Sequence, residues 1–266
     1  MQWNRGRNRT NDATRGEYMI TIGMIGGMSW ESTLTYYRLL NEAIQAECGG
    51  FHSANLLLAS VDFAEFEALM KQNAWDEIGN RLADISRKLE SAGAEMLMLC
   101  TNTMHLVADQ MEAAVRIPFL HIAEAMADAV AAKGLNTVAL LGTNTTMRQT
   151  FFRERLTRRG IQVLVPDEET MDGIHRIIFE ELCLGILSAE SKAFYVRAID
   201  ALATRGAQGV ILGCTEIGLL IQQADTTLPV FDTTVVHAEK AIQMALSAMR
   251  MGSDPTGSDP GEVSDE

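Results

Sequence analysis

The chain has 266 residues and a formal net charge of −13, and 47% of its residues are hydrophobic. This length allows one large globular domain or two smaller ones, and the hydrophobic fraction is sufficient for a sizeable core. The negative charge argues against a nucleic-acid backbone or an anionic membrane surface as a partner. No apolar run approaches the roughly 20 residues that span a bilayer, so we expect no membrane partner.

The two ends of the chain differ in composition from the rest. Residues 1–18 contain arginines but no apolar core, so they are not a secretory signal and are expected to form a flexible arm. Residues 252–266 repeat Gly-Ser-Asp-Pro and end in carboxylates. That composition is typical of a disordered acidic tail.

The chain contains four cysteines, and none of them belongs to a CxxC pair. They are Cys48, Cys100, Cys183 and Cys214. In a chain of this length without a secretory signal, we expect them to be reduced thiols in the cytoplasm. No second pair of ligands stands at a matching spacing, so we expect no metal site.

Three pairs of similar segments divide the chain into two halves. In the first two pairs an apolar run ends in glycine or polar residues, and in the third pair a proline is the second residue of a short apolar run. The pairs are 22–29 with 138–145, 91–103 with 204–216, and 117–120 with 228–231. Their offsets are about the same and their order is the same, which indicates an internal duplication.

The apolar runs alternate with amphipathic stretches such as Trp75–Ser91 and Ala189–Thr204. This alternation predicts parallel strands, buried on both faces and connected by crossover helices. We therefore predict an α/β fold of two pseudo-symmetric domains, each a parallel sheet flanked by helices. The first comprises residues 19–119 together with 232–251, and the second comprises residues 120–231.

Ligands bind beyond the carboxyl ends of strands in open parallel sheets, so the site is expected in the cleft between the domains. The duplication aligns two polar triplets that follow buried strands, Thr101–Thr103 and Cys214–Glu216. A pseudo-twofold axis would place Thr101 and Cys214 on opposite sides of the cleft. That geometry suits removal of a proton from one face of a carbon and its return to the other face.

A thiol is a suitable acid/base group because its reference pKa of about 8.5 is close to neutrality. Backbone N–H groups at the helix N-termini after the strands are expected to bind a carboxylate. Further donors would be the hydroxyls of Ser29, Thr103, Thr143, Thr146 and Thr215.

Simpler interpretations exist for several of these residues. Cys214 has the alternative of being a small buried hydrophobe. Cys100 precedes Thr101, so on a strand it would point to the opposite face, into the core. Glu216 could tune the thiol or cap the following helix. For His105 and His237, capping or packing is favoured over proton transfer.

At these residues the chain resembles the aspartate/glutamate racemase family, over about Thr21 to Met251. The combination of GCTEI with the Asn-Thr motif makes the resemblance specific. Within the family, the chain most resembles the enterobacterial-type amino-acid racemases, which are either broad in specificity or specific for L-Asp/Glu. The matching motifs are IGGMSWEST (25–33), SVDF (60–63), TNTMH (101–105), LGT (141–143) with TM (146–147), FEEL (179–182) and GCTEIGLL (213–220).

The resemblance implies a racemase that uses no cofactor, and so no pyridoxal phosphate, and works with two acid/base residues that are commonly both cysteines. It implies a small amino acid as substrate, bound between two α/β domains, usually in a homodimer. The substrate carboxylate and amino group would be held by residues that match Met28, Ser29, Asn102, Thr103, Thr143, Thr146 and Thr215, with Glu216 beside them.

The chain departs from the two-thiol pattern at Thr101, where most relatives have cysteine directly before Asn-Thr. Threonine is a far weaker acid than a thiol, so the two half-reactions are expected to differ. In addition, no arginine or lysine is identified that would clamp a carboxylate of the substrate side chain. Met70 and Cys183 stand roughly where polar or basic groups are expected, although the apolar surroundings of Cys183 favour a core position.

Three functions remain open from the sequence. The first is an amino-acid racemase of the aspartate/glutamate type, which the GCTEI and GGMSW motifs favour. The second is a one-thiol decarboxylase or cis–trans isomerase that acts on small diacids. The third is an amino-acid-binding protein whose catalytic pair has decayed.

Overall fold

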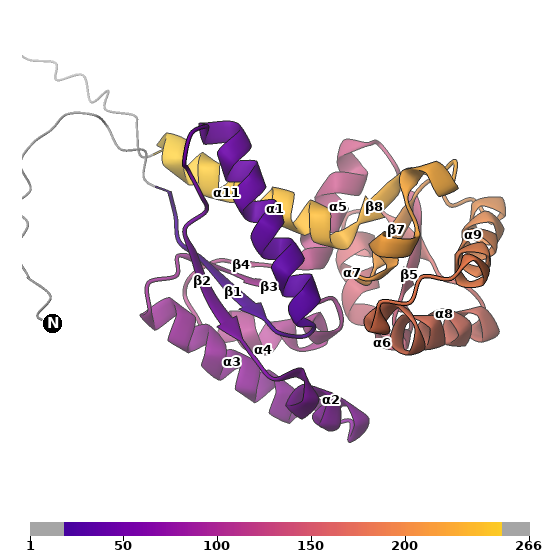
Figure 1. The fold of residues 1–266 in the computed structure, drawn as a ribbon, viewed down its shortest axis with the longest axis horizontal. Helices are drawn as coiled ribbons and strands as arrows, with labels where there is room; N and C mark the ends of the chain where they lie inside the picture. The colour runs from indigo at the N-terminus through magenta and orange to yellow at the C-terminus, as the bar shows by residue number, and fades with distance from the viewer. Residues whose placement is uncertain (1–18, 252–266) are drawn as a thin grey trace, which may run out of the picture.

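The computed structural model describes residues 19–251, with side chains as far as residue 247. The predicted flexible arm (1–18) and acidic tail (252–266) lie outside the described residues. Within the described range, no helix is long and apolar enough to cross a membrane. Figure 1 shows two lobes side by side, each with a sheet at its centre.

The sheet of the first lobe is parallel and has the strand order β2-β1-β3-β4. Its strands are β1 (Ile22–Gly26), β2 (Leu56–Ser60), β3 (Met96–Leu99) and β4 (Phe119–Leu120). The helices that follow these strands are α1 (Trp30–Cys48), α2 (Phe63–Lys71), α3 (Trp75–Ser91) and α4 (Ala108–Ala113). The central strands β1 and β3 are buried on both faces because α1 packs against one face and α3 and α4 pack against the other.

The sheet of the second lobe is also parallel and has the order β6-β5-β7-β8. Its strands are β5 (Thr137–Gly142), β6 (Gln162–Leu164), β7 (Val210–Gly213) and β8 (Val230–Asp232). Its helices are α5 (Ile122–Ala132), α6 (Asn144–Arg148), α7 (Thr150–Arg158), α8 (Glu168–Glu180), α9 (Ala189–Thr204) and α10 (Ile217–Leu220). Helices α5 and α7 cover one face of the sheet, and α8 and α9 cover the other.

The two sheets have the same order of equivalent strands, which confirms the predicted α/β fold with two similar parallel sheets flanked by helices. The predicted segment pairs correspond to β1 with β5, β3 with β7, and β4 with β8. The amphipathic stretches Trp75–Ser91 and Ala189–Thr204 are α3 and α9 with the predicted bounds. The limits between the two domains stay a prediction.

The last helix, α11 (Thr233–Met251), leaves the second sheet and packs on the first lobe. Its small residues Ala238 and Ala241 lie against Tyr36 and Leu40 of α1, and Figure 1 shows the two helices crossing. The helix begins at Thr233, directly after β8. The cause is Asp232, whose carboxylate accepts the free amides of Thr234 and Val235 at the helix start.

Candidate active site

The carboxyl ends of β1, β3, β5 and β7 surround a small pocket between the lobes, with a cavity volume of about 60 Å³. The loops after these four strands supply most of its lining. Those residues are Met28, Ser29, Thr101, Asn102, Thr103, Met104, Thr143, Gly213, Cys214, Thr215 and Glu216. Helical residues complete the wall, namely Phe63, Met70, Phe179 and Cys183. The pocket therefore lies where parallel-sheet topology places a ligand site.

All of the residues predicted for the site line this pocket except Thr146. Thr146 is fully buried behind the wall, where its hydroxyl lies 3.2 Å from the Thr143 hydroxyl. Its amide donates to the same Thr143 oxygen at 3.3 Å. Thr146 therefore positions Thr143, and its predicted contact with the substrate stays a prediction.

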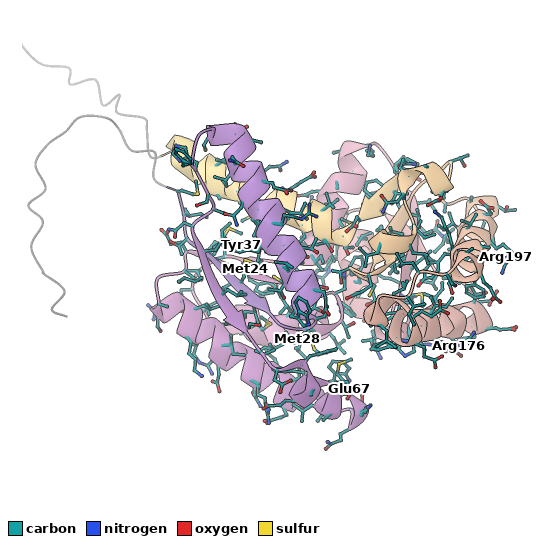
Figure 2. All side chains as sticks on the ribbon, viewed as in Figure 1. Met24, Met28, Tyr37, Glu67, Arg176 and Arg197 are labelled. Carbon is teal, nitrogen blue, oxygen red and sulfur yellow. The ribbon has the colours of Figure 1, made fainter. Side chains whose placement is uncertain are left out.

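The loop after β1 is fixed by glycine geometry. Gly27 has φ +93, and a Cβ on it would lie 2.2 Å from the Val61 carbonyl oxygen, so this position accepts only glycine. The Gly27 amide donates to the Thr33 hydroxyl at 2.8 Å, and Ser29 caps α1 by accepting from the Ser32 amide at 3.3 Å. These contacts place Met28 and Ser29 at the pocket, and Figure 2 shows Met28 at the junction of the lobes.

The Cys214 thiol donates to Oε2 of Glu216 at 2.9 Å, and the Thr215 hydroxyl donates to the same oxygen at 2.7 Å. Burial raises the pKa of Cys214 well above its usual range, and the negative charge of Glu216 raises it further. The resting form is therefore a neutral thiol in contact with a carboxylate. Glu216 makes no side-chain cap on α10, so the capping interpretation is wrong and the contact with the thiol is the observed one.

Hydroxyl groups from the two lobes meet at the pocket. Ser29 and Ser32 each donate to Oε1 of Glu216 at 3.2 Å, and Ser32 also contacts the Thr215 hydroxyl. A second bridge joins the hydroxyls of Thr103 and Thr143, 3.2 Å apart. Sequence reasoning missed Ser32, although it lies within the IGGMSWEST motif.

Asn102 is held by its amide nitrogen and leaves its amide oxygen free. Nδ2 donates to the Thr233 hydroxyl at 3.0 Å, and that hydroxyl donates to the Leu212 carbonyl at 2.8 Å. Asn102 is 4% exposed, and its Oδ1 has no partner among the described residues. A buried acceptor without a partner is costly, which fits an N–H donor supplied by a ligand. Thr233, which orients this amide, was also missed from the sequence.

Thr101 is buried at the end of β3, and a histidine holds its backbone. The Thr101 carbonyl accepts from Nδ1 of His105 at 2.7 Å, while Nε2 of His105 accepts from the Ile122 amide at 3.2 Å. Burial lowers the pKa of His105 well below its usual range, so the ring is neutral with its proton on Nδ1. His105 thus positions Thr101 through its main chain, in line with the predicted packing role.

His237 has a similar structural role, and its ring lies edge-on to that of His105, with the ring centroids 5.9 Å apart. Its Nε2 donates to the Leu120 carbonyl at 2.9 Å, and its Nδ1 accepts from the Tyr36 hydroxyl at 3.0 Å. Burial lowers the pKa of His237 to about 4. The ring is therefore a neutral link between α11, α1 and β4.

The other thiols differ in their surroundings. Cys100 is fully buried in the first lobe, as predicted, and burial raises its pKa. Cys183 is exposed and lines the pocket, so the core interpretation is wrong. The short 3-10 helix Leu182–Leu184 buries Leu182 instead and presents Cys183 to the pocket.

Within residues 19–251, no group of three His, Cys, Asp or Glu side chains is arranged to hold a metal ion.

A wider groove runs along α7 and β6 on the outer edge of the second sheet, lined by Arg153, Glu154 and Arg158 among others. It contains none of the predicted site residues. The strand-end pocket therefore remains the candidate active site, because it combines a thiol, a carboxylate, several hydroxyls and a free amide oxygen.

A sequence profile of the Asp/Glu/hydantoin racemase family matches residues 25–241. Among solved structures, a candidate Asp/Glu racemase of Yersinia pestis is 49% identical with a TM-score of 0.82, covering 86% of this chain and 100% of that one. An aspartate racemase homologue of Pyrococcus horikoshii is 38% identical with a TM-score of 0.76. The match covers 85% of this chain and 99% of that one. A broad-specificity amino-acid racemase of Bacillus subtilis is 21% identical over 179 residues, which are 65% of this chain and 74% of that protein.

Proposed function

The chain belongs to the Asp/Glu/hydantoin racemase family, and on that premise we propose that it racemises a small amino acid without a cofactor. In this proposal the α-proton moves between the Cys214 side and the Thr101 side of the pocket. The observation that carries the proposal is the equivalence of these two positions: Thr101 closely follows β3 and Cys214 directly follows β7, and both line one pocket.

On the second-lobe side, the thiol proton of Cys214 passes to Glu216, which already accepts a hydrogen bond from it at 2.9 Å. The thiolate left behind removes the α-proton from one face of the substrate. In the reverse direction, the Cys214 thiol donates a proton to the carbanion and Glu216 returns one to the sulfur. A positioned acid/base group of this kind contributes about 10²- to 10⁴-fold to a rate.

On the first-lobe side, Thr101 donates a proton to the opposite face of the carbanion, with water replenishing its hydroxyl. Threonine is a far weaker acid than cysteine, so this half-reaction is expected to be slower. Glu216 bonds to Cys214, Thr215, Ser29 and Ser32, so it assists the thiol rather than Thr101.

The remaining pocket residues would orient the substrate. The free Oδ1 of Asn102 is placed to accept a hydrogen bond from the substrate ammonium group. Donors for the carboxylate would be the hydroxyls of Ser29, Thr103, Thr143 and Thr215, with Met28 packed beside them. These donors stabilise the negative charge that develops when the α-proton leaves.

Incubation in D₂O with L- and D-amino acids, aspartate and glutamate included, tests the proposal. Proton NMR reports α-deuteration, and chiral chromatography reports inversion. We expect both for at least one amino acid. Release of CO₂ from a malonate, or conversion of maleate to fumarate, without amino-acid exchange would instead indicate a one-thiol enzyme acting on diacids. Tight amino-acid binding in calorimetry without exchange would indicate a binding protein.

We also propose that the protein acts as a cytoplasmic homodimer. All four cysteines are free, which fits a reducing compartment. Trp30, Leu34 and Tyr37 form an exposed apolar stripe on α1 at the i, i+4, i+7 spacing, and Figure 2 labels Tyr37 on this helix. Light scattering is expected to give the mass of a dimer for the wild type and of a monomer for Leu34→Glu. A monomeric wild type would contradict this.

A further inference from the structure

We propose that the distal end of the pocket takes an uncharged, apolar side chain in preference to a carboxylate. The inference rests on the proposed function, which supplies the α-amino-acid frame, and it names the substrate class for that site. It is carried by Phe63, Met70, Phe179 and Cys183, which we call the distal wall.

The distal wall comes from helices, whereas the polar side of the pocket comes from strand ends. Phe63 and Met70 are seven residues apart on α2, so they lie on one side of that helix and pack partly buried on the first lobe's core. Phe179 lies near the end of α8, and Cys183 lies in the 3-10 helix that follows. Figure 1 shows α2 and α8 on the same side of the molecule. A substrate anchored at the strand ends therefore presents its side chain to this wall.

A buried carboxylate requires a cation or several donors as partners. No lysine or arginine lines the pocket. On the helices that form the distal wall, the cations point elsewhere. Lys71 is exposed and pairs with Glu67 at 2.5 Å, and Arg176 is exposed on the outer surface of the second lobe in Figure 2.

Among residues 19–247, the titratable groups around the distal wall offer it no unpaired cation, because Arg148, whose charge acts on His175, is paired with Glu168 and Asp172. His175, whose ring centroid is 4.8 Å from that of Phe179, accepts from the Asn144 amide, and burial lowers its pKa, which favours the neutral ring. Although the Cys183 residue is exposed, its thiol is partly enclosed by the pocket wall, and this partial burial raises its pKa to about 12, with the charges of Glu216 and Glu31 contributing to the rise. A side-chain carboxylate placed here would meet charges of its own sign without a compensating cation.

Methionine gives this pocket an adaptable apolar lining. Met28, Met70 and Met104 all line it, and methionine side chains adjust to ligands of different shape because they are unbranched and flexible. The expected substrates are methionine and leucine, ahead of aspartate and glutamate.

The test compares kcat/KM for α-deuteration of methionine, leucine, aspartate and glutamate in D₂O. We expect methionine or leucine to exceed both diacids by about tenfold or more, because the diacids leave an unpaired carboxylate in the pocket. Met70→Arg is expected to reverse the order by supplying the absent cation. Met70→Leu, the matched control, is expected to retain the wild-type order, which separates the added charge from altered packing.

The outcomes separate this inference from the proposed function. If the wild type exchanges aspartate or glutamate faster than methionine and leucine, the inference is overturned while the racemase proposal stands. If no amino acid exchanges, the racemase proposal fails, and calorimetry on Cys214→Ala with the same panel decides the inference. Tighter binding of methionine than aspartate in that titration supports the apolar distal wall, and the opposite order overturns it.

Discussion

The two lobes share one strand order but present different chemistry at equivalent positions. After β7, Cys214 has a polarisable thiol in contact with the Glu216 carboxylate. After β3, Thr101 has a hydroxyl, and His105 holds its carbonyl rather than its side chain. Topology therefore determines where a site forms, whereas one or two side chains determine how reactive each half of it is.

The largest expected effect is at Cys214. Cys214→Ala removes the group that we assign to proton transfer on the second-lobe face, so α-deuterium exchange is expected to fall by about 10³-fold. NMR in D₂O measures the rate, and unchanged circular dichroism serves as the control for folding. Exchange at the wild-type rate would remove Cys214 from the mechanism.

The first-lobe face is tested by substitution at Thr101. Thr101→Ala is expected to slow racemisation by about 10- to 100-fold, because water alone is a poorly positioned proton donor. Thr101→Cys is expected to preserve or raise the rate and to make the two directions more alike. Full activity of Thr101→Ala in both directions would show that only one lobe contributes an acid/base group.

Much of this arrangement could be predicted from the sequence, because buried strands and their polar ends leave clear local patterns. The failures concern side-chain direction and contacts between lobes. An apolar stretch does not tell which way a 3-10 helix turns Cys183, and the short spacing from Thr143 does not show that Thr146 is fully buried beside it. Ser32 and Thr233 acquire their roles only when the two lobes meet, so periodicity within one lobe does not identify them.

The pH dependence of the rate is expected to reveal the effect of Glu216 on Cys214. Its negative charge raises the pKa of Cys214, so Glu216→Gln is expected to lower that pKa. Glutamine cannot accept the thiol proton, so in this variant Cys214 loses its proton to solvent and the maximum rate is expected to fall. Since the thiolate is the base, the rise of kcat/KM with pH is expected to move to lower pH. Glu216→Asp, the matched control, retains the charge and is expected to move the profile less. A shift to higher pH in Glu216→Gln would contradict this account of the pair.

A smaller effect is expected on stability, at the junction of α11 with the first lobe. His237 has a pKa of about 4 when folded, against about 6.5 when unfolded, so the unfolded chain binds the proton first as the pH falls. The contribution of the neutral His237 ring to the free energy of unfolding is present above pH 6.5 and decreases towards pH 4. This histidine is expected to reduce the free energy of unfolding by about 2 kcal/mol between pH 7 and pH 5.

Urea unfolding of the wild type and of His237→Gln at both pH values measures that decrease. Glutamine retains a donor and an acceptor for Leu120 and Tyr36 but does not titrate. The variant is therefore expected to have the weaker pH dependence. Equal pH dependence in the two proteins would mean that His237 does not titrate as its burial implies.

The most direct test of the asymmetric two-sided site follows the wild type in D₂O from each pure enantiomer of its best substrate, before equilibrium is reached. The inverted product is expected to contain deuterium while the recovered substrate retains its α-hydrogen, with unequal rates from the two enantiomers. Deuterium that accumulates in the recovered substrate without inversion would show that one group exchanges the proton on one face. That result would contradict the assignment of Cys214 and Thr101 to opposite faces.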